Sequence, residues 1–251
     1  MFHVAAESYD RFMGGWSRSL APLLADLAEL RPGQRALDVG CGPGSLTSEL
    51  VRRLGAASVS AVDPSEPFVA TARERHPGVD VRRATAEALP FDDDAFDAAL
   101  AQLVVHFMSD PPAGIQEMAR VTRPGGTVAA CVWDFGGGRG PLGPFWVAAR
   151  EVDPDVNDES ERAGALSGQL AALFRGAGLR DVEESDLAVQ RSYSGFDDWW
   201  EPFTRGVGPA GGFLASLDPA GRSQLEARCR SRLPSGSFDM TAHAWAARGV
   251  V

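Results

Sequence analysis

The sequence predicts an α/β protein in which helices cover both faces of a mostly parallel sheet. Short apolar segments alternate with amphipathic ones through the first half of the chain, which is the rhythm of successive β-α units. One apolar segment, residues 36–39, runs into the glycine-rich turn Gly40–Gly44, and the next, residues 59–62, ends in Asp63. Because ligands of parallel sheets bind beyond the carboxyl ends of the strands, a binding site is expected there.

The elements of the first half follow from their apolar periodicity. An amphipathic helix carries leucines at helical spacing between Ser19 and Leu30 and stops at Arg31-Pro32-Gly33. Strands and helices then alternate. Strands are expected near 35–40, 58–63, 79–84, 96–102 and 126–133, and helices near 45–55, 66–75 and 112–121.

The second half of the chain is less regular. Its two strands are predicted to pair as an antiparallel hairpin that closes the sheet. Residues 196–213 are rich in aromatic side chains and glycine and carry no predicted element. The elements expected elsewhere are a loop at 136–143, helices at 144–152, 169–175 and 219–233, and strands at 181–192 and 238–246.

The composition restricts the class of protein and its partners. The 251 residues, 44% of them hydrophobic, suffice for one large domain with a sizeable core. The formal net charge is −10, and all 24 basic residues are arginine. Because phosphate binding requires clustered positive charge, neither bulk nucleic acid nor an anionic membrane is expected as a partner.

The cysteines and the apolar runs indicate a location. Cys41, Cys131 and Cys229 form no C-x-x-C pair, so they are expected to be free thiols in a reducing compartment. No segment approaches the roughly 18 apolar residues of a membrane span, and the N-terminus lacks the pattern of a signal peptide. A cytoplasmic protein is expected.

The spacing of the glycine turn separates two classes of nucleotide-binding protein. A dinucleotide fingerprint reads G-x-G-x-x-G, whereas the turn here reads G-x-G-x-G. Asp38, two residues before the turn, would repel a pyrophosphate but suits a ligand with an ammonium and a sulfonium group. Asp63 stands where a carboxylate accepts hydrogen bonds from ribose hydroxyls. These residues therefore favour S-adenosylmethionine over a nicotinamide cofactor.

Two later motifs, Ala86–Phe91 and Arg123–Gly126, complete an ordered set. With residues 36–44 and Asp63, they resemble the class I S-adenosylmethionine-dependent methyltransferases of the small-molecule type, in particular the ubiquinone/menaquinone-biosynthesis-like methyltransferase domain family. The resemblance covers about residues 8–135. It implies a Rossmann-like fold: a seven-stranded, mostly parallel sheet with one antiparallel strand, helices on both faces and an N-terminal helical lid.

On this resemblance, residues 1–251 form a single methyltransferase domain. The resemblance is strongest in the cofactor half, so it speaks to the cofactor much more than to the acceptor. The expected parts are an N-terminal helical lid at 1–32, a cofactor-binding half at 33–135 and an acceptor-binding half with a helical insertion at 136–251.

The resemblance also implies roles for individual residues. Asp38 would help to place the ammonium group. Asp63 would bind the ribose hydroxyls, although an aspartate before Pro64 is also a common helix N-cap. Thr85 stands where related sequences often carry an aspartate for the adenine amino group, and Ala86 would donate its N–H to adenine. The full cofactor set is Tyr9, Asp38, Gly40, Cys41, Gly42, Gly44, Asp63, Pro64, Thr85, Ala86, Glu87, Gln102 and Leu103.

Two residues have competing interpretations. Tyr9 lies in a segment that resembles the lid, where a tyrosine closes over the cofactor carboxylate, but it would equally pack against the first helix. His106 follows the fourth strand, where an imidazole with a pKa near 6.5 could take a proton from the acceptor as a catalytic base. The alternative is that His106 anchors the helix after the strand through a backbone hydrogen bond.

The acceptor site is predicted only in outline. Asp110–Ala113 lacks the aromatic residue of the D-P-P-aromatic motif of nucleobase amine methyltransferases and fits a helix N-terminus instead. Aromatic side chains of the second half would either line an apolar acceptor pocket or belong to the core. Those expected at the pocket are Trp133, Trp146, Trp199, Trp200 and Phe203.

The predicted function is transfer of a methyl group from S-adenosylmethionine to an O, N or C atom of a small, apolar or aromatic molecule, with release of S-adenosylhomocysteine. In-line displacement at a sulfonium requires close, dry alignment and neither a metal nor a covalent intermediate. The alternative is a paralogue that binds the cofactor without turnover and serves as a sensor or partner subunit. The sequence leaves a homodimer open.

Overall fold

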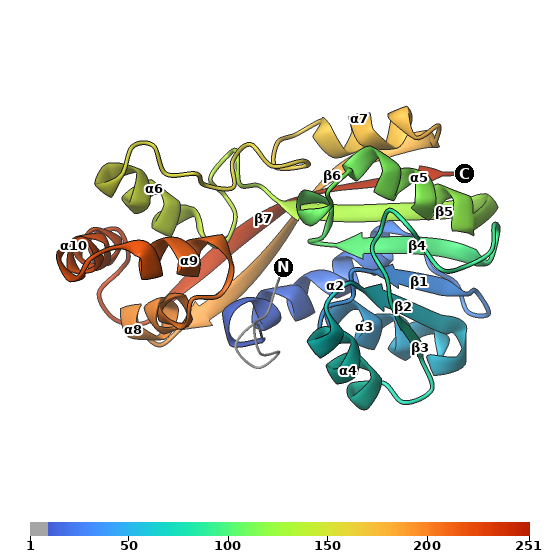
Figure 1. The fold of residues 1–251 in the computed structure, drawn as a ribbon, viewed down its shortest axis with the longest axis horizontal. Coiled ribbons are helices and arrows are strands. Elements are labelled where there is room, and N and C mark those ends of the chain that lie inside the picture. The colour runs from blue at the N-terminus through green and yellow to red at the C-terminus, as the bar shows by residue number, and fades with distance from the viewer. Residues whose placement is uncertain (1–9) are drawn as a thin grey trace.

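The computed structural model describes residues 10–251, which are built around one seven-stranded sheet. The strand order is β3-β2-β1-β4-β5-β7-β6 (Figure 1). Neighbouring strands pair in parallel up to β5, whereas β7 is antiparallel to both β5 and β6. The prediction of a mostly parallel sheet with one antiparallel strand is confirmed.

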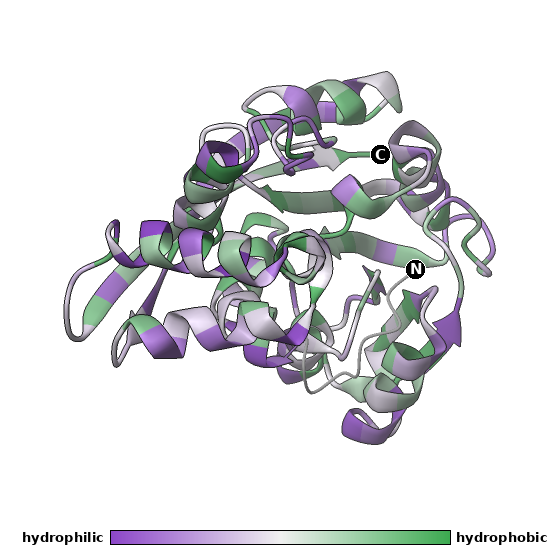
Figure 2. Cartoon of the chain, turned by 60° about the vertical axis from the view of Figure 1, so that its left-hand side comes forward, coloured by the Kyte–Doolittle hydropathy of each residue, from purple (hydrophilic) through white to green (hydrophobic). Residues whose placement is uncertain are grey.

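The two strands that lead into the predicted site, β1 and β2, are short and deeply buried. Every residue of β1 and β2 is buried, which is expected where helices cover both faces of a parallel sheet. Figure 2 shows hydrophobic central strands, while the surrounding helices alternate between hydrophobic and hydrophilic residues. The parallel strands are β1 Ala36–Val39, β2 Val59–Asp63, β3 Asp80–Arg83, β4 Phe96–Gln102 and β5 Thr122–Trp133.

The helices between these strands begin and end where local signals place them. α5 begins after Asp110, whose side chain accepts a hydrogen bond from Ala113 N, and it carries prolines in its first turn. α2 packs against α3, and α5 packs against the later helix α7 (Gln169–Gly176). These elements are η1 Asp10–Gly14, α2 Gly15–Leu27, α3 Ser45–Leu54, η2 Ala56–Ser58, α4 Glu66–Arg75, η3 Val105–Phe107 and α5 Pro111–Val121.

The second half of the chain forms a long hairpin and a group of helices. β6 (Arg180–Tyr193) and β7 (Phe238–Val250) pair from Tyr193↔Phe238 to Arg180↔Val250, so the predicted antiparallel hairpin is confirmed and is longer than expected. The remaining elements are α6 Gly143–Val152, α7 Gln169–Gly176, α8 Phe196–Trp200, η4 Glu201–Arg205, α9 Gly208–Ser216 and α10 Pro219–Arg230.

The segment without predicted elements is helical in the structure, because its aromatic side chains pack together. Phe145 of α6 stacks on Phe203 of η4 with ring centroids 4.7 Å apart, and Trp199 of α8 lies 4.8 Å from the same ring. Helices α6, α8, α9 and α10 gather at one end of the β6–β7 hairpin (Figure 1). Within residues 10–251, every helix is too short or too polar to span a bilayer.

Candidate functional site

A cavity of about 690 Å³ lies at the carboxyl ends of the parallel strands. Its wall draws on the segments that directly follow β1, β2, β3 and β4, and on Ser17 of α2. The wall residues run from Ser17 to Ser109, so residues 136–251 add none to the wall. The predicted cofactor residues in this wall are Asp38, Gly40, Cys41, Gly42, Asp63, Pro64, Thr85, Ala86, Glu87, Gln102 and Leu103.

The glycine turn is fixed to the neighbouring strand by its backbone. Gly40 N and Cys41 N both donate to the carbonyl oxygen of Val62 on β2, at 2.8 and 2.9 Å. Gly42 has a φ of +53°, and a Cβ built on it would meet no atom within 4 Å. Because Gly42 also lines the cavity, its missing side chain leaves room for a ligand against the backbone.

Gly44 lies outside the cavity wall, so its role in binding the cofactor stays a prediction. It is the N-cap of α3 with a φ of +99°. A Cβ at this position would lie 2.5 Å from Nε2 of His76, the residue that ends α4. Gly44 therefore lets α3 begin in close contact with α4 behind the turn.

Asp38 is a buried carboxyl group directly before the turn. It is 1% exposed, and its Oδ2 accepts a 2.6 Å hydrogen bond from Thr47 Oγ1 on α3. Burial raises the pKa of Asp38 from 3.8 to about 7, the charge of Asp63 adds to the rise, and the bond from Thr47 opposes it. A cationic group beside Asp38 would stabilise the ionised form and lower this pKa.

Asp63 joins the end of β2 to the glycine turn. Its Oδ2 accepts from Gly42 N at 2.9 Å, and its Oδ1 accepts from Ser65 N at 2.8 Å. The N-cap of α4 is Ser65, so Asp63 lies one turn before the helix. Burial raises the pKa of Asp63 against the effect of these two bonds. Each carboxylate oxygen has two lone pairs, so both can still accept from ligand hydroxyls.

The segment after β3 forms the part of the cavity wall next to Asp63, whose carbonyl oxygen accepts from Ala84 N at 3.2 Å. Thr85, Ala86 and Glu87 all line the cavity. Ala86 is 8% exposed, whereas Glu87 turns its carboxylate to the backbone that leads into α5. Glu87 Oε1 accepts from Ser109 N at 2.8 Å and from Asp110 N at 3.3 Å.

The end of β4 combines an unusual backbone conformation with an unpartnered amide oxygen. Leu103 has a φ of +61°, and its N–H donates to Cys131 O at 2.8 Å. A left-handed non-glycine residue costs about 1–2 kcal/mol, and such residues cluster at functional sites. Gln102 Nε2 donates to Ser17 O at 2.9 Å, while its buried Oε1 has no hydrogen-bond partner within the described residues.

His106 lies in η3, with its ring outside the cavity wall. The ring is 6% exposed, and its centroid is 3.9 Å from that of Phe107 and 5.5 Å from that of Phe135. Burial and the nearby charge of Arg162 lower its pKa to about 3, and Arg162 Nη1 donates to the His106 carbonyl oxygen at 3.2 Å. These contacts are those of a side chain that packs in the core. The catalytic role of His106 stays a prediction.

The five aromatic residues expected at an acceptor pocket are buried together in the core. Trp133 contacts Trp16 edge to face with centroids 6.2 Å apart, and Trp146 Nε1 donates to the buried Glu159 at 3.2 Å. None of them is part of the wall of the 690 Å³ cavity, so their role in binding an acceptor also stays a prediction. Their exposed fractions are 1% for Trp133, 5% for Trp146, 2% for Trp199, 8% for Trp200 and 2% for Phe203.

Some wall residues were not predicted. Phe107 and Met108 line the cavity beside Leu103, and their position just past the strand end was the available signal. Thr47 does not line the cavity but bonds to Asp38 behind it. It carries no such signal, since only the packing of α3 on β1 brings it to Asp38. Tyr9 lies outside the described residues.

Within residues 10–251, no three His, Cys, Asp or Glu side chains converge as a metal site would require.

Comparisons with known proteins agree with this geometry. Residues 37–130 match the family model described as a methyltransferase domain. The chain is 41% identical over 198 residues to a malonyl-[acyl-carrier protein] O-methyltransferase of Pseudescherichia vulneris, with 77% of this chain and 76% of the relative covered. It is 32% identical over 194 residues to an uncharacterized protein in a transposon of Streptomyces fradiae. That match covers 70% of this chain but only 56% of the relative.

Solved structures show the same architecture. The YcgJ protein of Bacillus subtilis aligns with a TM-score of 0.59 at 20% identity, covering 92% of this chain and 97% of that protein. This likeness concerns the fold, while the family match falls on the strands and turns that surround the cavity. With its glycine turn, its two buried aspartates and its sheet order, the chain belongs to the class I S-adenosylmethionine-dependent methyltransferases.

Proposed function

We propose that this protein transfers the methyl group of S-adenosylmethionine to an O, N or C nucleophile of a small, apolar or aromatic molecule. The observation that carries the proposal is the single cavity that joins the glycine turn, Asp63 and the segment 85–87 at the ends of four parallel strands. The family match supports it. The cofactor would supply a methyl group on a positively charged sulfur.

The residues present fit this cofactor. Asp38 offers a buried carboxylate to an ammonium group, and Gly42 leaves room for a ligand against the backbone. Asp63 keeps acceptor capacity for ribose hydroxyls, and Ala86 lies on the wall where the adenine would pack. Together these groups would bind and orient the cofactor. Correct orientation supplies most of the catalysis expected for an in-line displacement.

The described residues of the cavity wall favour an acceptor whose nucleophilic atom is already deprotonated and needs no general base. Its carboxylates, Asp38, Asp63 and Glu87, are engaged in hydrogen bonds within the chain. His106 is buried away from the wall with its pKa lowered to about 3, which makes it a weak base. A carboxylate oxygen is ionised at neutral pH, and the relative from P. vulneris is named a malonyl-[acyl-carrier protein] O-methyltransferase.

The alternative function is that of a paralogue that binds the cofactor without turnover. The engaged carboxylates and the buried His106 favour it too. A chain that transfers no methyl group needs no free base among the described residues of the cavity wall. The two functions differ in one measurement, the formation of S-adenosylhomocysteine.

The test combines binding with transfer. Calorimetry with S-adenosylmethionine should show one site, and Asp63→Asn should weaken binding at least tenfold by removing charge-assisted hydrogen bonds, about 1.5–3 kcal/mol each. Asp97→Asn is the matched control, since Asp97 lies at the start of β4, at the end of the strand away from the cavity. A panel of carboxylates, phenols and amines is then scored for labelled product. Absence of binding refutes the proposal, and binding without any product favours the alternative.

A further inference from the structure

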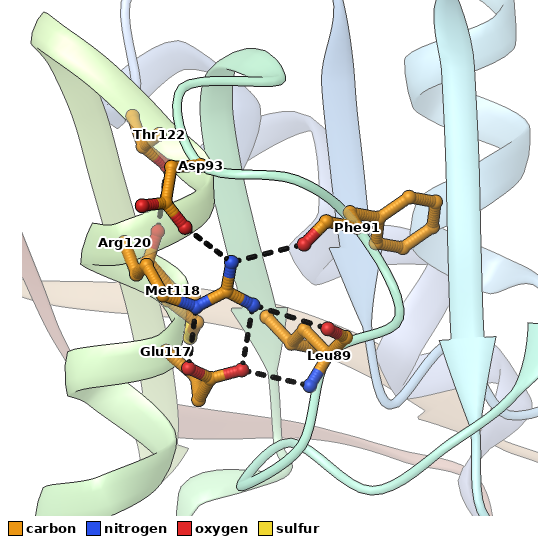
Figure 3. Close-up of polar contacts among 7 residues, drawn as sticks. All are labelled: Leu89, Phe91, Asp93, Glu117, Met118, Arg120 and Thr122. Carbon is orange, nitrogen blue, oxygen red and sulfur yellow. Dashed lines mark hydrogen bonds and ion pairs between the residues drawn. The ribbon is translucent and has the colours of Figure 1, made fainter.

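Arg120, near the end of α5, uses every N–H of its guanidinium group. Its Nε donates to Glu117 Oε1 at 2.6 Å, and Nη2 donates to Glu117 Oε2 at 2.8 Å and to Leu89 O at 3.1 Å. Nη1 donates to Phe91 O at 2.9 Å and to Asp93 Oδ1 at 2.7 Å (Figure 3). A guanidinium has five donors, and all five are satisfied by this one cluster.

The cluster binds a single segment, residues 89–94, to α5. Glu117 Oε2 accepts from Leu89 N at 2.9 Å, so both backbone groups of Leu89 are held (Figure 3). Asp94 N donates to the carbonyl oxygen of Arg120 at 3.1 Å, and Asp94 has a φ of +57°. The backbone of the segment is therefore fixed at Leu89, Phe91 and Asp94.

A second contact ties the same loop to the start of α5. Glu87 accepts from Ser109 N and Asp110 N, and only Ala88 separates Glu87 from Leu89. The cavity-facing residues Thr85 and Ala86 directly precede these two contacts. Because α5 is packed against β4 and β5, it provides a rigid support from which the position of Ala86 is set.

We infer that Arg120, oriented by Glu117, is a positioning residue that fixes the loop 85–94 so that residues 85–87 face the adenine base. The inference rests on the proposed function, because it assigns a role to a loop that the proposal places beside the cofactor. Arg120 itself is not part of the cavity wall. It acts through the backbone of Leu89 and Phe91, where a bidentate, planar donor cannot be replaced by a lysine.

The test measures recognition of the base. S-adenosylhomocysteine and its inosine analogue, in which a carbonyl replaces the adenine amino group, are titrated into the purified chain by calorimetry. Arg120→Met should bind S-adenosylhomocysteine about tenfold more weakly, because a loop displaced by a fraction of an ångström loses its aligned contacts. The ratio of the two affinities should fall at least threefold relative to the wild-type ratio, roughly one lost contact to the base.

Arg123→Met is the matched control. Arg123 is also a partly exposed arginine with an ion pair, at 2.7 Å to Asp97, but it lies at the start of β5, away from the cavity. The control should keep the wild-type ratio. A folded Arg120→Met with affinity and ratio within about twofold of wild type overturns the inference, and so does an equal loss of ratio in the control.

A second variant covers loss of folding. If Arg120→Met does not fold, Glu117→Gln weakens the same cluster while keeping its shape, and an unchanged affinity ratio in that variant overturns the inference. If the wild-type chain binds neither ligand, the proposed function fails. If the wild type discriminates between the two ligands and the variants discriminate equally well, only the inference about Arg120 fails.

Discussion

Thr47 and Asp38 are joined by a 2.6 Å hydrogen bond that links α3 back to the strand preceding the glycine turn. Both side chains are almost fully buried, at 0% and 1% exposure. The hydroxyl donates to the carboxylate, which stabilises the ionised form. Even so, the pKa of Asp38 is raised to about 7, so burial outweighs the bond.

Cofactor binding is predicted to weaken as the pH falls below about 7. In the free protein Asp38 is protonated below its pKa of about 7, whereas a cationic ligand binds best to the carboxylate. Binding must then expel a proton, and the affinity should fall by up to about tenfold per pH unit. Burial also raises the pKa of Asp63, which acts in the same direction.

Calorimetry from pH 5.5 to 8.5 in two buffers of different ionisation enthalpy checks this prediction, since proton release appears as a buffer-dependent heat. Asp38→Asn is the control and should bind weakly with a flatter profile. A wild-type affinity that is constant over this range would contradict it.

Thr47→Val is predicted to move the same profile to higher pH. Valine keeps the shape of threonine but cannot donate to Asp38, so the pKa of Asp38 rises further and the loss of affinity begins about one pH unit higher. Thr71→Val on α4 is the matched control, because the hydroxyl of Thr71 donates only to the backbone of its own helix. If both variants retain the wild-type profile, the hydrogen bond has no electrostatic role at this site.

Alanine substitutions at Gly40 and Gly42 are predicted to affect different properties: stability at Gly40 and cofactor affinity at Gly42. At Gly40, with a φ of +73°, a Cβ would lie 2.5 Å from Val104 Cγ2, so Gly40→Ala should cost about 3 kcal/mol of unfolding free energy. At Gly42 a Cβ meets no atom of the chain. Gly42→Ala should cost only about 1–2 kcal/mol of stability but lower cofactor affinity at least tenfold. Urea unfolding and calorimetry separate the two effects, and wild-type affinity in Gly42→Ala would be the contrary result.

His106 variants are predicted to lose stability and keep turnover. The ring is buried against Phe107 and Phe135, so His106→Ala should cost about 1–3 kcal/mol on thermal unfolding. His106→Phe keeps a ring there and should be closer to wild type, because the buried Nδ1 has no hydrogen-bond partner within the described residues. A large fall in kcat in His106→Phe with unchanged cofactor binding would instead establish the imidazole as the base.

Much of the sheet could be predicted because its signals are local. β4 was expected at 96–102 and α4 at 66–75, and both have these bounds in the structure. Apolar runs, glycine turns and prolines near helix starts depend only on neighbouring residues. The same logic brought Asp38, Asp63 and Ala86 together, since each lies near the carboxyl end of a parallel strand or shortly beyond it.

The parts that could not be predicted depend on contacts between distant residues. The helices between Phe196 and Ser216 contain proline and several glycines, and they form because aromatic rings from α6, α8 and η4 bury one another. The bond from Thr47 to Asp38 requires the packing of α3, and the burial of His106 requires Phe135, which is far along the chain.

The β6–β7 hairpin has a consequence for how this protein can change. The chain leaves β6 at Tyr193 and returns to β7 at Phe238, and these two residues are direct partners in the ladder. The helices between them are thus inserted at the tip of one hairpin, with entry and exit points side by side. Such a segment can be exchanged for another of different length without shifting the strand register, and the 690 Å³ cavity, lined by residues from Ser17 to Ser109, would keep its wall.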